Sequence, residues 1–307
     1  MSLEAWRDCY WPILVESVRP ATSRGYDVAW RKRVKPWLGH RRIESISVGD
    51  IEAAIAGWKG TASTRGDALS LLSRLLDGAA RSGVIESNPA RLARRPKDER
   101  ADSFRSRALR MSEVSTMLEH VEAGPYRDYL AALVYTGMRA GEASALRVGD
   151  VDVDGRVIHV RRNFGTTASG AAVEQTPKSH KERTVPLPEV LVPTMRRAIE
   201  DKRRTELVFT GPRGGQLNTS NVRRAVGWEA LRERLDRPDL RIHDLRHTLA
   251  TLLFDAGTAA NDVQAILGHS SLQVTERYSR ARLDAAKRAG AALDGMFEAD
   301  AGGMRSA

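Results

Sequence analysis

Six side chains in the last half of the chain have the types needed to attack a phosphodiester bond. They are cations, proton carriers and one phenol, and they occur in the order Arg139, Lys178, His243, Arg246, His269 and Tyr278. Arginine binds phosphate oxygens through a planar fork of donors, and histidine and lysine carry protons. A phenol among such groups can act as a nucleophile. The set therefore predicts phosphoryl transfer.

Each of these residues is weak evidence when taken alone. An HxxR run occurs often by chance, a single tyrosine is usually half-buried packing, and Lys178 could be a solvated turn residue. Arg139 and Glu142 could form a structural ion pair. The prediction depends on their occurrence together, in one order, within the runs TGMRAGEASAL, TPKSHKERTVPL, HDLRH and LGHSS, with Tyr278 nine residues after His269.

Electrostatics explains why this set would suit a tyrosine nucleophile. A free phenol has a pKa near 10, and nearby cations favour its charged form. The same cations stabilise the negative charge that develops at a pentacoordinate phosphorus. A covalent tyrosyl link conserves the energy of the phosphodiester, so resealing would need no ATP. The chain has no acidic cluster typical of two-metal nucleases, and we expect cleavage without a metal ion or cofactor.

A helix over residues 243–256 would position the histidines and one arginine. His243, Arg246 and His247 would then share one face, and the inward positions would be Leu245, Leu249, Leu252 and Leu253. The first turn of such a helix favours phosphate, because its backbone N–H groups are unpaired and its dipole is positive there.

The length of 307 residues suggests two domains, and the pattern of apolar residues predicts a mainly α fold with a small β-sheet (α+β). We expect residues 1–93 to form a helical domain, 94–106 a linker, 107–283 a mixed domain and 284–307 a tail. Predicted helices in the first domain cover residues 3–17, residues 22–35 with Pro36 as the stop, a segment from Asp50, and a segment from a Thr64 cap to Gly83. In the second they cover a segment capped by Ser112, then 125–136, 189–203, 219–235, 243–256 and 260–267, with 284–298 as another in the tail. Three β-prone stretches, 156–162, 172–176 and 183–187, predict one three-stranded sheet.

Charge indicates a polyanionic partner. The net charge is +10, and the first 95 residues carry 16 basic against 10 acidic side chains. An arginine bias can also reflect a GC-rich genome, and the linker can also be a plain spacer. The candidates for DNA contact are Arg24, Arg31, Lys32, Arg33, Arg94 and Arg95.

Neither a membrane span nor a secretion signal is evident in the sequence. No apolar run approaches the length that crosses a bilayer, and the N-terminus carries acidic residues where a signal peptide has a basic flank. We expect a cytoplasmic protein. Cys9 is the only cysteine, which excludes an intramolecular disulfide, and we interpret it as a small apolar filler in the first helix.

The ordered set R…K…HxxR…GH…Y resembles the tyrosine recombinase (phage integrase) family, and the match covers residues 3–285. The resemblance implies a helical core-binding domain followed by a mixed catalytic domain. It also implies that Tyr278 forms a 3′-phosphotyrosyl bond while Lys178 protonates the leaving 5′ oxygen, with Lys181 as the alternative acid. The other implied roles are phosphate clamps for Arg139 and Arg246, proton acceptance for His243, a phosphate hydrogen bond for His269, and a supporting role for Glu142. His247 adds another imidazole, which we interpret as a hydrogen-bonding support residue.

The resemblance also implies a site-specific recombinase that integrates or excises a phage or mobile element through a Holliday junction. Its partners would be core sites in double-stranded DNA, three further copies in a tetramer assembled from free monomers, and an accessory directionality or DNA-bending protein. Because the helical module begins within the first few residues, we expect no arm-site binding. The protein would act in a bacterial host cell and associate with the nucleoid.

Three other functions stay open at this stage. A Xer-like recombinase that resolves chromosome dimers would use the same chemistry. A type IB topoisomerase would relax supercoils as a monomer, and a regulator would bind DNA without cleaving it. Residues 284–297 have apolar positions at helical spacing, so the tail could pack on its own domain or on a neighbouring protomer.

Overall fold

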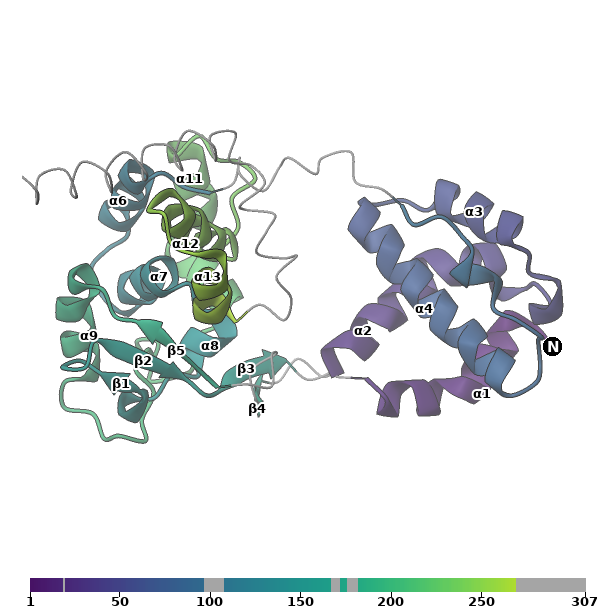
Figure 1. Cartoon of the computed structure of the whole chain (residues 1–307), viewed down its shortest axis with the longest axis horizontal. Coiled ribbons are helices and arrows are strands. Elements are labelled where there is room, and N and C mark those ends of the chain that lie inside the picture. Colours follow the sequence, from purple (N-terminus) through teal and green to yellow (C-terminus); the bar gives the residue numbers. More distant parts are fainter. Residues whose placement is uncertain (19, 97–107, 167–171, 176–181, 269–307) are drawn as a thin grey trace, which may run out of the picture. The chain divides into compact units, whose positions relative to one another are not determined.

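Two compact units make up the computed structural model, which describes residues 1–18, 20–96, 108–166, 172–175 and 182–268 (Figure 1). One unit comprises residues 1–101 and 165–173, and the other comprises 102–164 and 174–307. Each has its own hydrophobic core. Most of the predicted linker and the whole predicted tail, including the helix over 284–298, lie outside the described residues.

Helices packed around α4 form the first unit. Its elements are α1 (Leu3–Glu16), α2 (Pro20–Ala29), a π-helical segment (Trp30–Gly39), α3 (Val48–Gly57) and α4 (Ala62–Arg81), with short 3-10 turns at Ile43–Ser45 and Pro89–Arg91. Leu71, Leu72, Leu75 and Leu76 on α4 are fully buried. Trp6 on α1 packs into this core and donates its indole N–H to the Leu75 carbonyl at 2.8 Å. The predicted all-helical character of this part is confirmed.

Several local predictions in the first unit are wrong. Pro36 does not stop its helix, because the chain continues as a π-helical segment to Gly39. A wider π turn accommodates a residue without an N–H, and the burial of Trp30, Val34 and Leu38 holds the segment on the core. Thr61, not Thr64, caps α4, since its hydroxyl accepts from the Thr64 N–H at 3.3 Å. Cys9 is exposed and is not a core filler.

The second unit surrounds the buried helix α7. Its helices are α6 (Met111–His120), α7 (Pro125–Thr136), α8 (Ala140–Ser144), α9 (Val192–Ile199), α10 (Thr219–Ala225), α11 (Trp228–Arg234), α12 (Asp244–Asp255) and α13 (Ala260–Leu267), with 3-10 turns at Val148–Asp150 and Glu189–Leu191. Tyr129, Leu130 and Ala132 on α7 have no exposed surface, and α7 packs against α12. The helices at 125–136, 243–256 and 260–267 match their predictions within one residue at each end.

Three other helix predictions in this unit need correction. The helix expected over 189–203 is shorter, because a 3-10 turn occupies Glu189–Leu191 and α9 ends at Ile199. The helix expected over 219–235 is two helices, because Gly227 adopts the left-handed conformation between them (φ 60°). Arg110, not Ser112, precedes the first turn of α6, and Glu113 accepts from the Arg110 N–H at 2.7 Å. A carboxylate three residues into a helix can thus fix its start without a hydroxyl cap.

The β-structure is split into two small sheets. The first has the order β1–β2–β5, all antiparallel, from Val151–Asp152, Val157–Val160 and Arg183–Pro186. Its register pairs Ile158 with Val185. A separate sheet pairs β3 (Asn163–Thr166) with β4 (Ala172–Gln175). The single sheet predicted from 156–162, 172–176 and 183–187 is therefore wrong in its middle strand, because the short hairpin partner β1 occupies the position beside β2. The predicted class, mainly α with a small β content, is confirmed.

Every helix among the described residues is too short or too polar to cross a lipid bilayer.

Leu72→Ala should destabilise the first unit by about 2–5 kcal/mol, because Leu72 is fully buried and removal of its side-chain atoms leaves a cavity in the core. Leu92→Ala is the matched control, since Leu92 is 76% exposed, and it should change the free energy of unfolding by less than about 0.5 kcal/mol. Urea titration followed by tryptophan fluorescence measures both, because five of the six tryptophans belong to this unit. Equal effects of the two substitutions would contradict the assigned core.

Candidate active site

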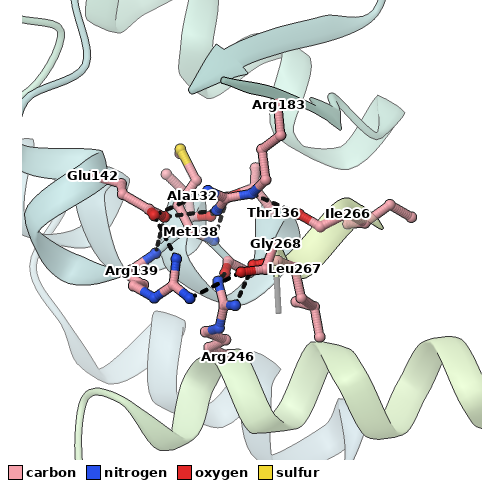
Figure 2. A network of polar contacts seen from close by, with 11 residues as sticks. Ala132, Thr136, Met138, Arg139, Glu142, Arg183, Arg246, Ile266, Leu267 and Gly268 are labelled. Atoms are coloured by element: carbon pink, nitrogen blue, oxygen red, sulfur yellow. Dashed lines mark hydrogen bonds and ion pairs between the residues drawn. The ribbon is translucent and has the colours of Figure 1, made fainter. Parts of the chain in front are cut away.

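The structure brings Arg139, Glu142 and Arg246 together within the second unit (Figure 2). His243 lies near enough for the charges of Arg246 and Arg139 to act on it. Arg139 precedes α8 and Glu142 lies on it, while Arg246 lies on α12. Figure 2 shows Arg139, Glu142 and Arg246 around the end of α13 together with an arginine from β5, Arg183. The other predicted catalytic residues, Lys178, its alternative Lys181, His269 and Tyr278, lie outside the described residues.

The run TGMRAGE forms a sharp corner that orients Arg139. Helix α7 ends at Gly137, which is left-handed (φ 65°). A methyl group at Gly137 would stand 2.8 Å from side-chain carbons of Leu249 and Leu267, so both the conformation and the close packing require glycine. Two residues later, the Arg139 N–H donates to Glu142 Oε2 at 2.8 Å and starts α8. The corner thereby places Arg139 and Glu142 side by side.

The Glu142 side chain is fully buried and binds two guanidinium groups. Arg139 Nη1 donates to Oε1 at 2.8 Å. Arg183 donates through both terminal nitrogens, Nη1 to Oε1 at 2.9 Å and Nη2 to Oε2 at 2.6 Å. Burial alone would raise the pKa of Glu142, but the hydrogen bonds and charge of Arg183, with the charge of Arg139, hold that pKa at about 2. The carboxylate is therefore ionised at neutral pH.

Arginines also bind the C-terminal end of α13. Three of them, on three elements, donate to three consecutive main-chain carbonyls: Arg183 Nε to Ile266 at 2.9 Å, Arg246 Nη2 to Leu267, and Arg139 Nη2 to Gly268 at 3.1 Å. The last carbonyls of a helix lack partners within it and carry the negative end of its dipole. The guanidinium groups therefore fix the point from which the chain continues to His269 and Tyr278.

Arg246 is almost fully buried. It is 3% exposed, and its Nη1 donates to the Gly137 carbonyl at 2.7 Å. Its guanidinium therefore joins α12 to the ends of α7 and α13. Leu245 is buried as predicted, whereas Leu249, Leu252 and Leu253 are only half-buried.

His243 lies directly before α12 at the edge of this network. Its ring meets that of His247 edge to face, with centroids 5.0 Å apart. The residue retains exposed surface, yet desolvation of the ring lowers the pKa of His243 below its ordinary value, and the charge of Arg246 lowers it further. The imidazole is thus neutral near pH 7 and able to accept a proton.

Asp244 stabilises the start of α12 through a hydrogen bond to the main chain. Its side chain is buried, and Oδ2 accepts from the Arg241 N–H at 2.8 Å. Burial raises the pKa of Asp244, and His247 Nε2 lies 3.9 Å from the other carboxylate oxygen. His247 is therefore placed beside both His243 and a carboxylate.

The candidate DNA-contact residues all lie in the first unit. Five are exposed: Arg24, Arg31, Lys32, Arg94 and Arg95. Arg33 is half-buried and donates through Nε to the Lys59 carbonyl at 2.9 Å. Among the described residues, no group of three or more His, Cys, Asp or Glu side chains is arranged to hold a metal ion.

Sequence reasoning missed Arg183, although it lies in the same run as Lys178. The available signal was Glu142, because a carboxylate in an apolar helical segment needs more positive charge than one neighbouring arginine supplies. Residue spacing could not show that Arg183 would pair with Glu142, since the two residues are 41 positions apart in the sequence.

Glu142→Gln should cost the protein stability at neutral pH and progressively less in acid. The folded pKa of about 2 lies below the ordinary value of 4.5, so the contribution, about 3 kcal/mol, is present above pH 4.5 and is lost as the pH falls toward 2. Urea titrations of both proteins between pH 7 and 3 measure the difference in the free energy of unfolding. Glu182→Gln is the control. The Glu182 carboxyl is exposed and lies 3.5 Å from Arg161 Nε, so its loss should have little effect on stability. A difference for Glu142→Gln that does not change with pH would refute the assigned ion pair.

Relatives of known sequence match most of this chain. An integrase of prophage phiRv2 from Mycobacterium tuberculosis is 29% identical over 276 residues, covering 84% of this chain and 72% of that protein. A tyrosine recombinase XerC from Corynebacterium efficiens is 29% identical over 306 residues, covering 90% of this chain and 86% of its own.

Solved structures share the fold at low sequence identity. The Tn1549 transposon integrase in complex with transposon right end DNA has a TM-score of 0.78 at 18% identity, covering 96% of this chain and 100% of that one. A lambda integrase tetramer bound to a Holliday junction has a TM-score of 0.65 at 20% identity, covering 88% of this chain and 78% of that one.

The family model described as the phage integrase family matches residues 107–284, which is more than half of the chain. That range contains all six residues singled out by their chemistry as well as the network around Glu142. The chain therefore belongs to the phage integrase family of tyrosine recombinases, enzymes that cleave and rejoin DNA.

Proposed function

We propose that this recombinase integrates and excises the DNA of a phage or related mobile element at specific core sites. The observation that carries the proposal is that Arg139 and Arg246 bind the end of α13, which precedes Tyr278 in the sequence, and that His243 lies within reach of both charges. The relationship to a prophage integrase supports the biological role.

In the proposed cleavage step, Tyr278 Oη attacks the scissile phosphorus and forms a 3′-phosphotyrosyl bond. The bond from phosphorus to the 5′ oxygen breaks, and Lys178 gives that oxygen a proton. The tyrosine proton passes to His243, whose lowered pKa keeps it neutral and receptive. Rejoining is the same step in reverse with a new 5′ hydroxyl, so it needs no ATP and no other cofactor.

The phosphate itself would be held by cations. We assign Arg139 and Arg246 to the non-bridging oxygens, with His269 as a further donor. Charge of this density stabilises the pentacoordinate transition state, which is the electrostatic contribution that usually dominates such catalysis. Glu142 keeps Arg139 oriented through the 2.8 Å contact, and His247 supports His243 through ring contact.

The first unit would supply most of the grip on DNA. We assign residues 1–93 to core-site binding and 107–283 to catalysis, joined by the linker 94–106. The exposed basic residues Arg31 and Lys32, with Arg94 and Arg95, suit contacts to phosphate. Four protomers would bring two sites together, and the lambda integrase tetramer bound to a Holliday junction supports this number. An accessory directionality or DNA-bending protein would select between integration and excision.

A Xer-like role in resolving chromosome dimers is the second candidate. It is favoured by the similarity to tyrosine recombinase XerC, which extends over 90% of this chain. The chemistry is the same in both cases, so the DNA target distinguishes them. Covalent capture of the site selected from a random-sequence library, followed by its location in the genome, would separate a phage attachment site from a chromosomal resolution site.

Tyr278→Phe should abolish the covalent protein–DNA adduct and retain DNA binding, because it removes only the nucleophilic oxygen. The substrate is a nicked duplex carrying the site that the wild type selects from the library. A denaturing gel detects the adduct, and a mobility shift detects binding. Tyr126→Phe removes another phenol from the same unit and should leave the adduct intact. An adduct that survives Tyr278→Phe would rule out this nucleophile.

Lys178→Ala should slow cleavage by about 100-fold or more, the usual contribution of a positioned acid. A 5′-thio leaving group should restore the rate, since a thiolate leaves without a proton. Lys181→Ala, tested on the same two substrates, is the comparison. Thio rescue confined to Lys181→Ala would move the acid role to Lys181.

A further inference from the structure

We propose that Arg183 is a positioning residue for DNA cleavage, because it fixes the Glu142 carboxylate and the end of α13 relative to one another. The inference rests on the function proposed above and adds a residue to its site. Arg183 touches no reacting atom in this role. It acts through Glu142 on Arg139 and through a main-chain carbonyl on the segment that precedes His269.

The Arg183 guanidinium is oriented completely by its contacts. Its side chain is 7% exposed. Both terminal nitrogens bind Glu142, at 2.9 and 2.6 Å, and the third nitrogen, Nε, binds the Ile266 carbonyl at 2.9 Å. A planar fork that meets a carboxylate on one edge and a carbonyl beside it has one orientation, so α8 and α13 cannot shift independently.

The C-cap of α13 is shaped to admit this side chain. Gly268 is left-handed (φ 63°) and ends the helix. A methyl group at Gly268 would stand 2.8 Å from Arg183 Cδ and 3.1 Å from its Nε. Glycine is therefore required here both for the left-handed conformation that ends the helix and for the close approach of the Arg183 side chain.

Arg183 also joins the site to the sheet. It begins β5, where it pairs in register with Val160 of β2, and it follows Lys178 by five residues. One side chain thus links the strand that follows Lys178, the helix that carries Glu142, and the helix that precedes His269 and Tyr278. A shift of about 1 Å among catalytic groups typically costs about 100-fold in rate.

Arg183→Lys tests this role against a matched control, Arg237→Lys. Arg237 also binds a glutamate with two nitrogens, Glu113 at 2.9 and 3.1 Å, and approaches a main-chain carbonyl, that of Ala108, at 3.5 Å. Lysine keeps the charge at either position but cannot reproduce the fork. Both substitutions therefore remove the same kind of interaction from the same unit, and only one removes it from the site.

The readout is the single-turnover rate of adduct formation on the captured site at saturating DNA, alongside the dissociation constant and the melting temperature. We expect Arg183→Lys to lower the rate about 100-fold with little change in the dissociation constant, and Arg237→Lys to stay within about threefold at a comparable loss in melting temperature. A double variant with Glu142→Gln should lose little beyond Glu142→Gln alone, because the two residues act as one unit.

Gly268→Ala is the second variant, used where Arg183→Lys does not fold, and it should slow cleavage by displacing Arg183 from α13. A wild-type rate of adduct formation in Arg183→Lys would overturn the inference, and so would a wild-type rate in Gly268→Ala if that variant is tested instead. Neither result would affect the proposed function. Equal losses in Arg183→Lys and Arg237→Lys would also overturn the inference, because stability alone would then explain the effect. A wild-type protein that forms no adduct with any DNA would instead refute the proposed function itself.

Discussion

The ion pair between a buried carboxylate and two arginines is the interaction on which the second unit depends. Moving a charge such as that of Glu142 out of water is costly, and it is tolerated only when partners and hydrogen bonds replace the lost hydration. Arg183 and Arg139 supply both, and together they hold the pKa of Glu142 at about 2. The carboxylate in return orients two side chains that would otherwise be flexible and mutually repulsive. The carboxylate therefore stabilises the close approach of these two guanidinium groups.

The end of α13 is the second half of the same arrangement. Three guanidinium groups converge on its last carbonyls, where the helix dipole supplies partial negative charge without any acidic side chain. Arg139 and Arg246, the proposed phosphate ligands, are among the three. The position of this helix end and the binding of a phosphate are therefore linked through shared donors.

Sequence patterns predicted the presence of helices better than the residues at which those helices begin and end. The helices at α7, α12 and α13 follow from apolar periodicity, and Gly137 ends α7 as a left-handed glycine should. The errors lie where tertiary contacts outweigh local preference. The chain stays helical past Pro36, as a π-helical segment, because Val34 and Leu38 are buried in the core. In the larger sheet, β2 pairs with β1 and β5, and β4 belongs to the other sheet.

The sequence alone determined which chemistry the chain carries, because the identities and order of Arg139, Lys178, His243, Arg246, His269 and Tyr278 suit attack on a phosphodiester and match one family. It also determined the helical class, since periodicity is a local property. The tertiary structure alone decided that Arg183 completes the Glu142 ion pair and that Arg246 is buried against the ends of α7 and α13. Such pairings join residues far apart in the chain, and they depend on how helices and strands pack, which residue spacing does not encode.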